Sequence, residues 1–355
     1  TVTGEALTIT GQGGANGALQ VGANSTGTWA GSVTTTGTEA RLGAQLGGHL
    51  IINGNIDASA RSVIIRTNGD ASTSGATFDN TAVTFGGTYT GSDILFYQGV
   101  LKLGASDRIS DSTLITMGTS STNIRQRFDL NGFNETIAGL AVSGGAASAT
   151  HEVTNTSGTA STLRLNSGTN RAFSGIVTGN LSVEKLGSNT VTFSGINTYT
   201  GSTTVSTGTL NVTGELNGGG SMLVAAGATL DLNTLGTFLF NIGENGVNNS
   251  ITGAGTTNLN GILNLNLALA ARADGNSWQL VNTTGTTSWT GVRLNSTSGN
   301  FTDDGGTWRL LDGDSTWTFN QGTGILSLAQ VPEPGQFALL IAGLAGCALR
   351  RRRAA

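Results

Sequence analysis

Four aspartates late in the chain come nearest to a group of residues that could do chemistry. Asp303 and Asp304 precede two glycines, and Asp312 and Asp314 flank a third. Two convergent carboxylates could serve glycoside hydrolysis, and carboxylates in a loop could bind calcium. The second pair lacks the later Gly and Glu of an EF-hand, and Asp beside Gly is typical of turns. We therefore expect turns at both places, with calcium at Asp312 and Asp314 left open.

The other reactive residue types form no recognisable centre. His49 and His151 are far apart in the sequence, and neither has the spacing of a metal-ligand pair. Cys347 is the single cysteine, so no internal disulfide can form. We find no Gly-x-Ser-x-Gly nucleophile elbow with a suitable histidine after it. We expect a protein that is not an enzyme and that uses no cofactor or metal.

Aromatic residues gather towards the C-terminus. Four of the five tryptophans are Trp278, Trp289, Trp308 and Trp317. Exposed rings could stack on sugars, but a repeat protein also needs an atypical terminal unit to close its core. We favour packing in a terminal cap, with a sugar-stacking face as the alternative.

Composition indicates an exported repeat protein. Glycine accounts for 56 of 355 residues, and 11% of residues are charged against about 25% in ordinary domains. Both prolines, Pro332 and Pro334, lie near the C-terminus, and proline is excluded from interior strands. Without residues 331–355 the body holds 13 basic and 20 acidic side chains, which argues against nucleic-acid binding. The sequence begins at Thr1, and we expect a secretion leader to be missing.

Apolar and polar residues alternate in short runs separated by turn residues. In residues 162–165 and 209–212, leucine or valine occupies every second position, with Arg164 or Asn211 between them. This period of two predicts strands whose polar residues point outward. Strands are expected, among other places, over residues 6–10, 49–52, 62–66, 100–103, 112–117, 162–165, 190–193, 209–212, 228–232 and 262–267. The nearest approach to a helix before residue 331 is residues 268–272, which are too few.

One supersecondary unit occurs twice. Tyr-Thr-Gly-Ser at 89–92 is followed by a glycine-led apolar run at 99–103, and Tyr-Thr-Gly-Ser at 199–202 by a similar run at 208–212. Each unit is too small to bury its apolar face alone, so units must stack on one another. The repetition therefore favours a solenoid over a sandwich, barrel or propeller.

The second copy resembles a known family. Residues 185–195 read Lys-Leu-Gly-Ser-Asn-Thr-Val-Thr-Phe-Ser-Gly and continue through Tyr-Thr-Gly-Ser to residues 208–210. This pattern resembles the autotransporter-associated β-strand repeat. Residues 85–103 resemble a degenerate copy, and residues 128–140 resemble a linking coil. The resemblance covers most of residues 1–232 and implies a right-handed parallel β-helix on an exported protein, without catalytic residues.

The C-terminal end carries a second resemblance. Pro332, Glu333 and Pro334 are followed by the apolar run 337–349 and then by four arginines. This order is similar to a PEP-CTERM sorting signal. The resemblance implies that a membrane exosortase recognises the Pro-Glu-Pro segment and cleaves nearby.

The apolar run should interact with the membrane only briefly. It has 13 residues, whereas about 20 are needed to span a bilayer as a helix. A cluster of arginines after such a run is retained at the cytoplasmic face. The arginines expected to stop the segment in the membrane are Arg350, Arg351, Arg352 and Arg353.

We therefore predict an all-β protein: a right-handed parallel β-helix over 1–232, a terminal β cap over 233–330, and a sorting segment over 331–355 with a short hydrophobic helix. The expected function is that of an exported structural or adhesin-like protein at the cell surface or outside the cell, with an exosortase as partner. Extracellular polysaccharide or other cells are further possible partners. The alternatives are a polysaccharide-active β-helix enzyme and a passenger fragment of an autotransporter.

Overall fold

The computed structural model describes residues 1–14, 17–37, 39–59, 62–68, 80–118, 125–143 and 151–331. The elements they form are β-strands, joined by turns and loops. They divide into two compact units. Of the described residues, the first comprises those within 1–239, 251–263 and 283–292, and the second comprises 240–250, 264–282 and 293–331.

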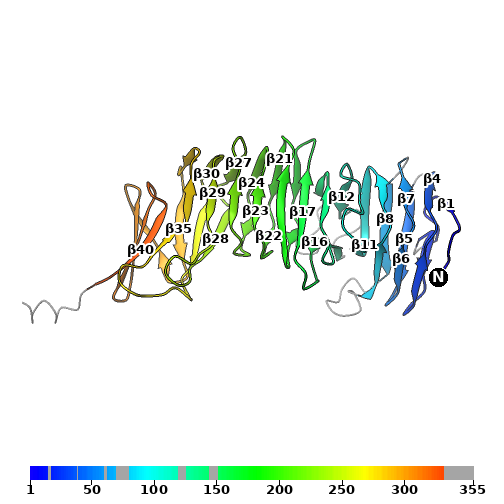
Figure 1. Ribbon diagram of the computed structural model, residues 1–355, viewed down its shortest axis with the longest axis horizontal. Helices are drawn as coiled ribbons and strands as arrows, with labels where there is room; N and C mark the ends of the chain where they lie inside the picture. The colour runs from blue at the N-terminus through cyan, green and yellow to red at the C-terminus, as the bar shows by residue number, and fades with distance from the viewer. Residues whose placement is uncertain are drawn as a thin grey trace, which may run out of the picture. The chain divides into compact units, whose positions relative to one another are not determined.

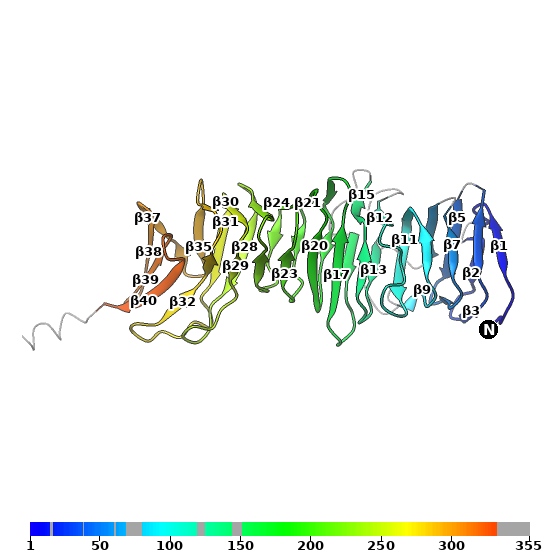
Figure 2. The ribbon, with the colours of Figure 1, turned by 45° about the horizontal axis from the view of Figure 1, so that its top comes forward.

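In the middle of the first unit, each strand pairs in parallel with the third strand further along the chain (Figures 1 and 2). One ladder contains β17 (Ser161–Asn166), β20 (Leu181–Leu186), β23 (Thr203–Val205) and β26 (Met222–Val224). A second contains β18 (Arg171–Phe173), β21 (Thr190–Phe193), β24 (Thr209–Val212) and β27 (Thr229–Leu232). A third contains β22 (Ile196–Asn197), β25 (Glu215–Leu216) and β28 (Thr237–Asn241). Three parallel ladders that advance together are consistent with a β-helix or solenoid.

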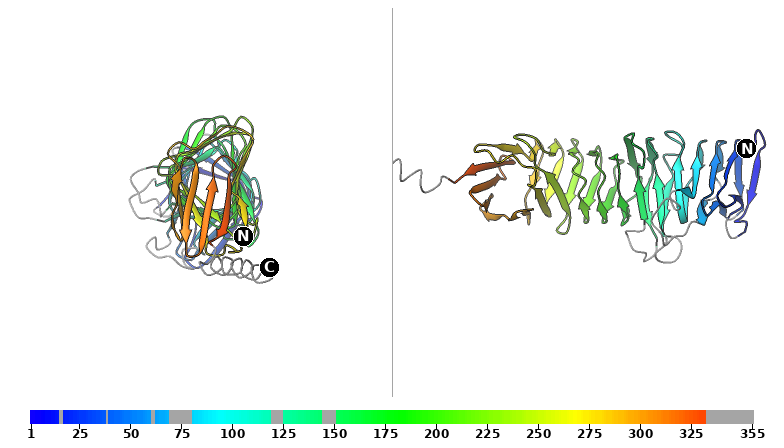
Figure 3. Two further views of the ribbon diagram at one scale, coloured as in Figure 1. Left: turned by 90° about the vertical axis from the view of Figure 1, so that its left-hand side faces the viewer. Right: turned by 90° about the horizontal axis from the view of Figure 1, so that it is seen from below.

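A coil in this region takes 19 or 20 residues. The side chains of Asn211 and Thr192, 19 residues apart, are hydrogen-bonded, and the Thr190 amide donates to the side chain of Asn170, 20 residues earlier. Seen end-on, successive coils of the first unit overlie one another (Figure 3, left). Each interior strand therefore finds ladder partners on both sides, as expected for stacked repeats.

The beginning of the first unit follows the same plan with coils of more variable length. One ladder contains β1 (Leu7–Thr10), β4 (Val33–Thr36), β7 (Ile56–Ala58) and β10 (Tyr89–Gly91). A second contains β2 (Leu19–Val21), β5 (Glu39–Gln45), β8 (Ser62–Asn68), the first part of β11 (Asp93–Leu103), β12 (Leu114–Met117) and β15 (Gly139–Val142). A third contains β3 (Thr26–Trp29), β6 (His49–Ile52), β9 (Ala82–Phe85), the second part of β11, β13 (Gln126–Asp129) and β16 (His151–Thr154).

The core consists of columns of apolar side chains that run from coil to coil. Phe173, Phe193, Val212 and Leu232 occupy matching positions in four successive strands, and all four are buried. The predicted alternation is confirmed, because the leucines on either side of Arg164 are fully buried while the Arg164 side chain is 35% exposed. Burying such columns is the main favourable term in forming the stack.

Each strand segment predicted from the sequence overlaps a strand, although four of them (6–10, 112–117, 228–232 and 262–267) extend one or two residues past its ends. Residues 268–272 form no helix, in agreement with their shortness. The right-handed sense of the coil stays a prediction, and so do the boundaries at 232 and 330. The short C-terminal helix expected within 337–349 lies outside the described residues.

The second unit contains an antiparallel sheet. Its strands are β32 (Ser277–Gln279), β40 (Ile325–Gln330), β39 (Ser315–Asn320), β38 (Thr307–Asp312) and β37 (Thr302–Asp304), in that order across the sheet. Tight glycine-containing turns join β37 to β38 and β38 to β39. Neighbouring antiparallel strands can be joined by such short turns, whereas the parallel ladders need a whole coil.

Candidate functional site

The predicted sorting residues lie outside the described part of the chain. Pro332, Glu333 and Pro334 follow directly on Val331, where the description ends one residue after β40. The four arginines predicted to stop the segment in the membrane, Arg350 to Arg353, are outside it as well. Among the described residues, no helix is both long and apolar enough to cross a membrane.

The four candidate aspartates border the two tight turns that were predicted: Asp303 and Asp304 end β37, Asp312 ends β38, and Asp314 lies in the turn that follows. The Asp303 carboxylate accepts a hydrogen bond from the Gly306 amide at 2.8 Å in the turn from β37 to β38. Asp312 and Asp314 flank Gly313, whose φ of 62° is a left-handed value that glycine adopts readily. Among the residues that the structure describes, no three His, Cys, Asp or Glu side chains are grouped to hold a metal ion.

Asp312 also forms an ion pair. An Arg272 guanidinium nitrogen lies 2.6 Å from its carboxylate, and this hydrogen bond is the main reason that the pKa of Asp312 is lowered. Arg272 in turn lies 5.8 Å from the centre of the Trp317 ring. The carboxylate is thus engaged in holding the second unit together.

The tryptophans of the second unit belong to its core. The ring centres of Trp278 and Trp317 are 5.4 Å apart, and each residue has at most 1% of its surface exposed. Trp308 is buried too, whereas Trp289 lies in the first unit and is half-buried. Three of the four therefore present no open ring face for a sugar.

The two histidines do not come together. His49 lies on β6 and His151 on β16, with β9, β11 and β13 between them in the ladder. The His49 Nε2 atom is 2.7 Å from the Thr84 hydroxyl, and burial, followed by the charge of Lys102, lowers its pKa. A hollow of about 270 Å³ opens beside it, lined by Thr26, Gly47, His49, Asn80, Ala82 and Lys102.

A row of ion pairs extends across the strands that follow, and sequence reasoning missed it. Glu152 on β16 accepts hydrogen bonds from Arg127 at 2.8 Å and from Arg125 at 3.3 Å. On the neighbouring strands, Lys102 lies 3.9 Å from the fully buried carboxylate of Asp129. These charges are 25 to 27 residues apart in the sequence, so only knowledge of the coil length could have paired them.

The segment that carries the repeat pattern buries a lysine. Lys185 lies between Leu165 and Val205 in a core column and is fully buried. Its ammonium donates to three backbone carbonyls, those of Leu186 at 2.7 Å, Gly187 at 2.6 Å and Thr207 at 3.0 Å. Desolvation lowers the pKa of Lys185 to about 8. The ammonium thereby joins two successive coils at a corner.

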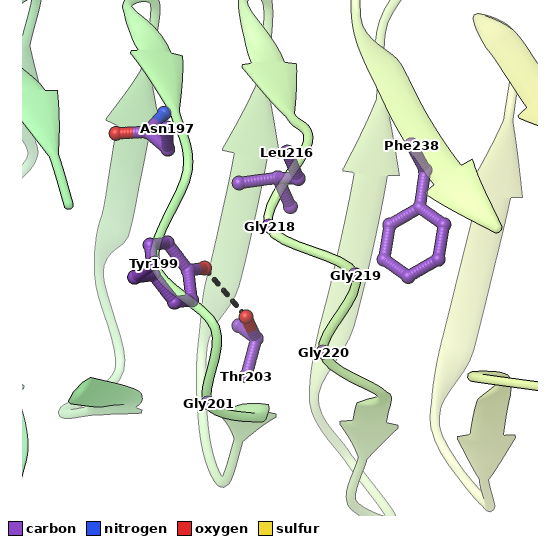
Figure 4. Close-up of a pocket in the computed structure, with 9 residues that line it drawn as sticks. All are labelled: Asn197, Tyr199, Gly201, Thr203, Leu216, Gly218, Gly219, Gly220 and Phe238. Atoms are coloured by element: carbon purple, nitrogen blue, oxygen red, sulfur yellow. Dashed lines mark hydrogen bonds between the residues drawn. The ribbon is translucent and has the colours of Figure 1, made fainter. Parts of the chain in front are cut away.

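The tyrosine of the repeat points into the coil interior (Figure 4). The Tyr199 hydroxyl is hydrogen-bonded to the Thr203 hydroxyl at 2.5 Å, and burial raises the pKa of Tyr199 to about 12. In the other copy, the Tyr89 hydroxyl donates to the Asp93 carbonyl at 2.6 Å, again four residues on. Both tyrosines therefore stabilise the same corner, which supports the predicted duplication.

A cavity of about 10 Å³ lies beside Tyr199, near the lower limit for one water molecule. The coil after Tyr199 has three consecutive glycines here, Gly218 to Gly220, and so contributes no ring (Figure 4). The cavity is too small for a substrate. It is a packing feature of the repeat.

Comparison with known families agrees with these segments. Residues 183–212 match the passenger-associated transport repeat. The match includes Lys185 and Tyr199, and it confirms the resemblance to an autotransporter-associated repeat. Residues 330–353 match the PEP-CTERM protein-sorting motif, which includes the Pro-Glu-Pro segment and the arginines. No curated protein matches the chain.

The two matches narrow the class of protein. The sorting motif indicates an exported protein with an exosortase as partner, and the transport repeat points to an autotransporter-related passenger. Both are consistent with an association with the cell envelope. The matched segments together cover a minor part of the chain.

Proposed function

We propose that this protein is a non-enzymatic structural or adhesive component of the cell surface or extracellular matrix, built as a right-handed β-solenoid and released by an exosortase. The observation that carries the proposal is the combination of a sorting motif at 330–353 with a body of stacked parallel coils. An exported body of stacked coils is suited to serve as a scaffold, because its function would depend on its surface and not on a pocket.

The stacked coils are physically suited to such a role. Strands in successive coils satisfy each other's backbone hydrogen bonds, and core columns fill the interior. Low charge avoids placing like charges on neighbouring coils, which lie about 4.8 Å apart. The outcome is a firm body with long polar faces, on which extracellular polysaccharide or another cell could bind.

The sorting segment would act before the body reaches its final place. In this proposal the apolar run 337–349 enters the inner membrane for a short time, and Arg350 to Arg353 keep its end in the cytoplasm. The exosortase recognises Pro332, Glu333 and Pro334 and cleaves nearby. The body then leaves the membrane without its C-terminal segment.

The test is to express the full chain, behind a secretion signal, with and without an exosortase, and to locate it by cell fractionation and intact-mass measurement. With the enzyme, we expect the protein outside the inner membrane and lighter by a fragment that begins near Pro332. A variant with Pro332→Ala, Glu333→Gln and Pro334→Ala should remain in the membrane fraction at full mass.

A matched control replaces the exposed acidic pair of the β37–β38 turn, Asp303→Asn with Asp304→Asn. This variant should be processed like the unchanged chain, because the pair lies outside the sorting segment. Full-length protein retained in the membrane fraction despite an active exosortase would contradict the proposal.

A further inference from the structure

A β-bulge interrupts the long strand β11 at Tyr97. Strand β11 pairs with β8 through Phe96 opposite Ile65, and pairing resumes with Gln98 opposite Arg66, so Tyr97 is an extra residue. A bulge redirects the side chain of the extra residue and is a common device beside functional sites. The direction of the Tyr97 side chain therefore needs an explanation beyond strand pairing.

The Tyr97 ring lies against two arginines from the preceding coils. The guanidinium carbon of Arg41 on β5 is 5.2 Å from the ring centre, and that of Arg66 on β8 is 6.0 Å from it. Such cation–π contacts hold a guanidinium in place without neutralising it. Arg41, Arg66 and Tyr97 are called the arginine patch below.

Neither arginine of the patch has an acidic partner among the described residues. No ion pair or hydrogen bond joins Arg41 or Arg66 to a carboxylate there, and the Nε atom of each is buried without a hydrogen-bond partner. Other arginines of the first unit are paired, for example Arg127 with Glu152 and Arg164 with Glu184.

Two acidic residues on the strands of the patch each accept a hydrogen bond from a neutral side chain and form no ion pair with it. Glu39, two positions before Arg41 on β5, accepts a hydrogen bond from the Gln12 side chain at 2.7 Å. Asp93, at the start of β11, accepts one from the Ser92 hydroxyl at 2.7 Å. Within the described part of the chain, therefore, no carboxylate pairs with either of these two half-buried arginines, which lie on adjacent coils.

We propose that the arginine patch binds the carboxylate groups of an acidic polysaccharide. A guanidinium presents a planar fork of N–H donors that matches a carboxylate. Arg66 lies opposite Gly43, so Arg41 and Arg66 are diagonal neighbours, two register positions apart on adjacent strands. Stacking on Tyr97 positions both forks in advance, which lowers the entropy lost on binding.

The net negative charge of the rest of the body favours a narrow anionic polymer, rather than a broad anionic surface, as the ligand of the arginine patch. Residues before 331 hold 13 basic and 20 acidic side chains, so an anionic membrane or an acidic protein would meet net repulsion over a wide contact. A single glycan chain is narrow and needs a smaller contact area around the patch. The choice of a polysaccharide rests on the extracellular location proposed above, whereas binding by the patch can be measured on the purified chain.

The test measures binding of the purified full chain to polygalacturonate by biolayer interferometry, with the fully methyl-esterified polymer as the uncharged comparison. We expect binding to polygalacturonate that weakens with salt and no binding to the ester. The double variant Arg41→Gln with Arg66→Gln should bind at least about tenfold more weakly. Arg164→Gln, which removes an arginine from an ion pair elsewhere on the first unit, should bind like the unchanged chain.

A second variant guards against a loss of folding. Tyr97→Ala keeps both charges but removes the ring that positions them, and it should weaken binding less than the double variant while leaving the circular dichroism spectrum unchanged. The proposal is overturned if the chain does not bind polygalacturonate, if it binds the ester equally, or if the double variant binds undiminished. Binding only to vesicles of anionic phospholipid would also overturn it. None of these outcomes depends on whether the exosortase processes the chain.

Discussion

At the scale of single residues, Lys185 departs from the rule that charge faces outward. Its neighbours in the column, Leu165 and Val205, are apolar. Among the described residues its ammonium donates to three backbone carbonyls and to no carboxylate. A buried charge without a counter-ion costs free energy, which the carbonyl dipoles offset only in part. The lowered pKa of Lys185 expresses this cost.

We predict that the free energy of unfolding rises at alkaline pH, because Lys185 loses its proton there and the cost of burying its charge disappears. Below pH 8 the lysine is protonated in both the folded and the unfolded chain, so it contributes no slope. Between pH 8 and 10.5 the unfolded chain still binds the proton that the folded chain has lost, so the free energy of unfolding rises with pH. The rise amounts to at most about 3 kcal/mol.

The measurement is urea unfolding of the unchanged chain and of Lys185→Met at several values between pH 7.5 and 10.5. The variant should lack the rise, whatever its stability at one pH, and the difference between the two curves isolates Lys185 from the tyrosines that titrate nearby. Lys102→Met, which removes a partly exposed lysine, should keep the rise. Parallel curves for Lys185→Met and the unchanged chain would show that the ammonium is not desolvated.

At the scale of elements, glycine decides how closely successive coils approach. A Cβ atom on Gly218 would lie 1.6 Å from the Tyr199 carbonyl oxygen of the preceding coil. We predict that Gly218→Ala lowers the free energy of unfolding by about 3 kcal/mol, because the two backbones must separate. Gly168 lies in another turn with nothing within 4 Å of its Cβ position, so Gly168→Ala should be nearly neutral. Thermal unfolding followed by circular dichroism distinguishes the two, and equal melting temperatures would refute the idea.

The sequence predicts the strands well where a local rule governs them. Period-two alternation identified 190–193 and 209–212 with their correct bounds, because the inward face must be apolar whatever the fold. The bulge at Tyr97 and the pairing of β32 with β40 depend on partners distant in the sequence, and no local pattern records them. The same reason hid the arginine patch, since Arg41 and Arg66 become neighbours only through the register of β5 and β8.

At the scale of the whole molecule, the candidate site follows from repetition more than from any motif. The sorting segment could be predicted because its residues are consecutive, from Pro332 to Arg353. The arginine patch could not be predicted in this way, because it is assembled from several coils of unequal length. A stack in which each coil touches mainly its neighbours should nevertheless tolerate the loss of one complete coil.

We predict that deleting residues 209–228 leaves a folded protein. Thr209 and Thr229 occupy the same register position in β24 and β27, so Gly208 would lead directly into β27 and every ladder would close with one strand fewer. Stability should fall modestly, by one coil's share of the core. Deleting only 209–218 removes part of a coil, breaks the three-ladder register and should abolish cooperative unfolding. Circular dichroism and size-exclusion chromatography compare the two deletions. If both behaved alike, folded or unfolded, register between coils would not be what holds the first unit together.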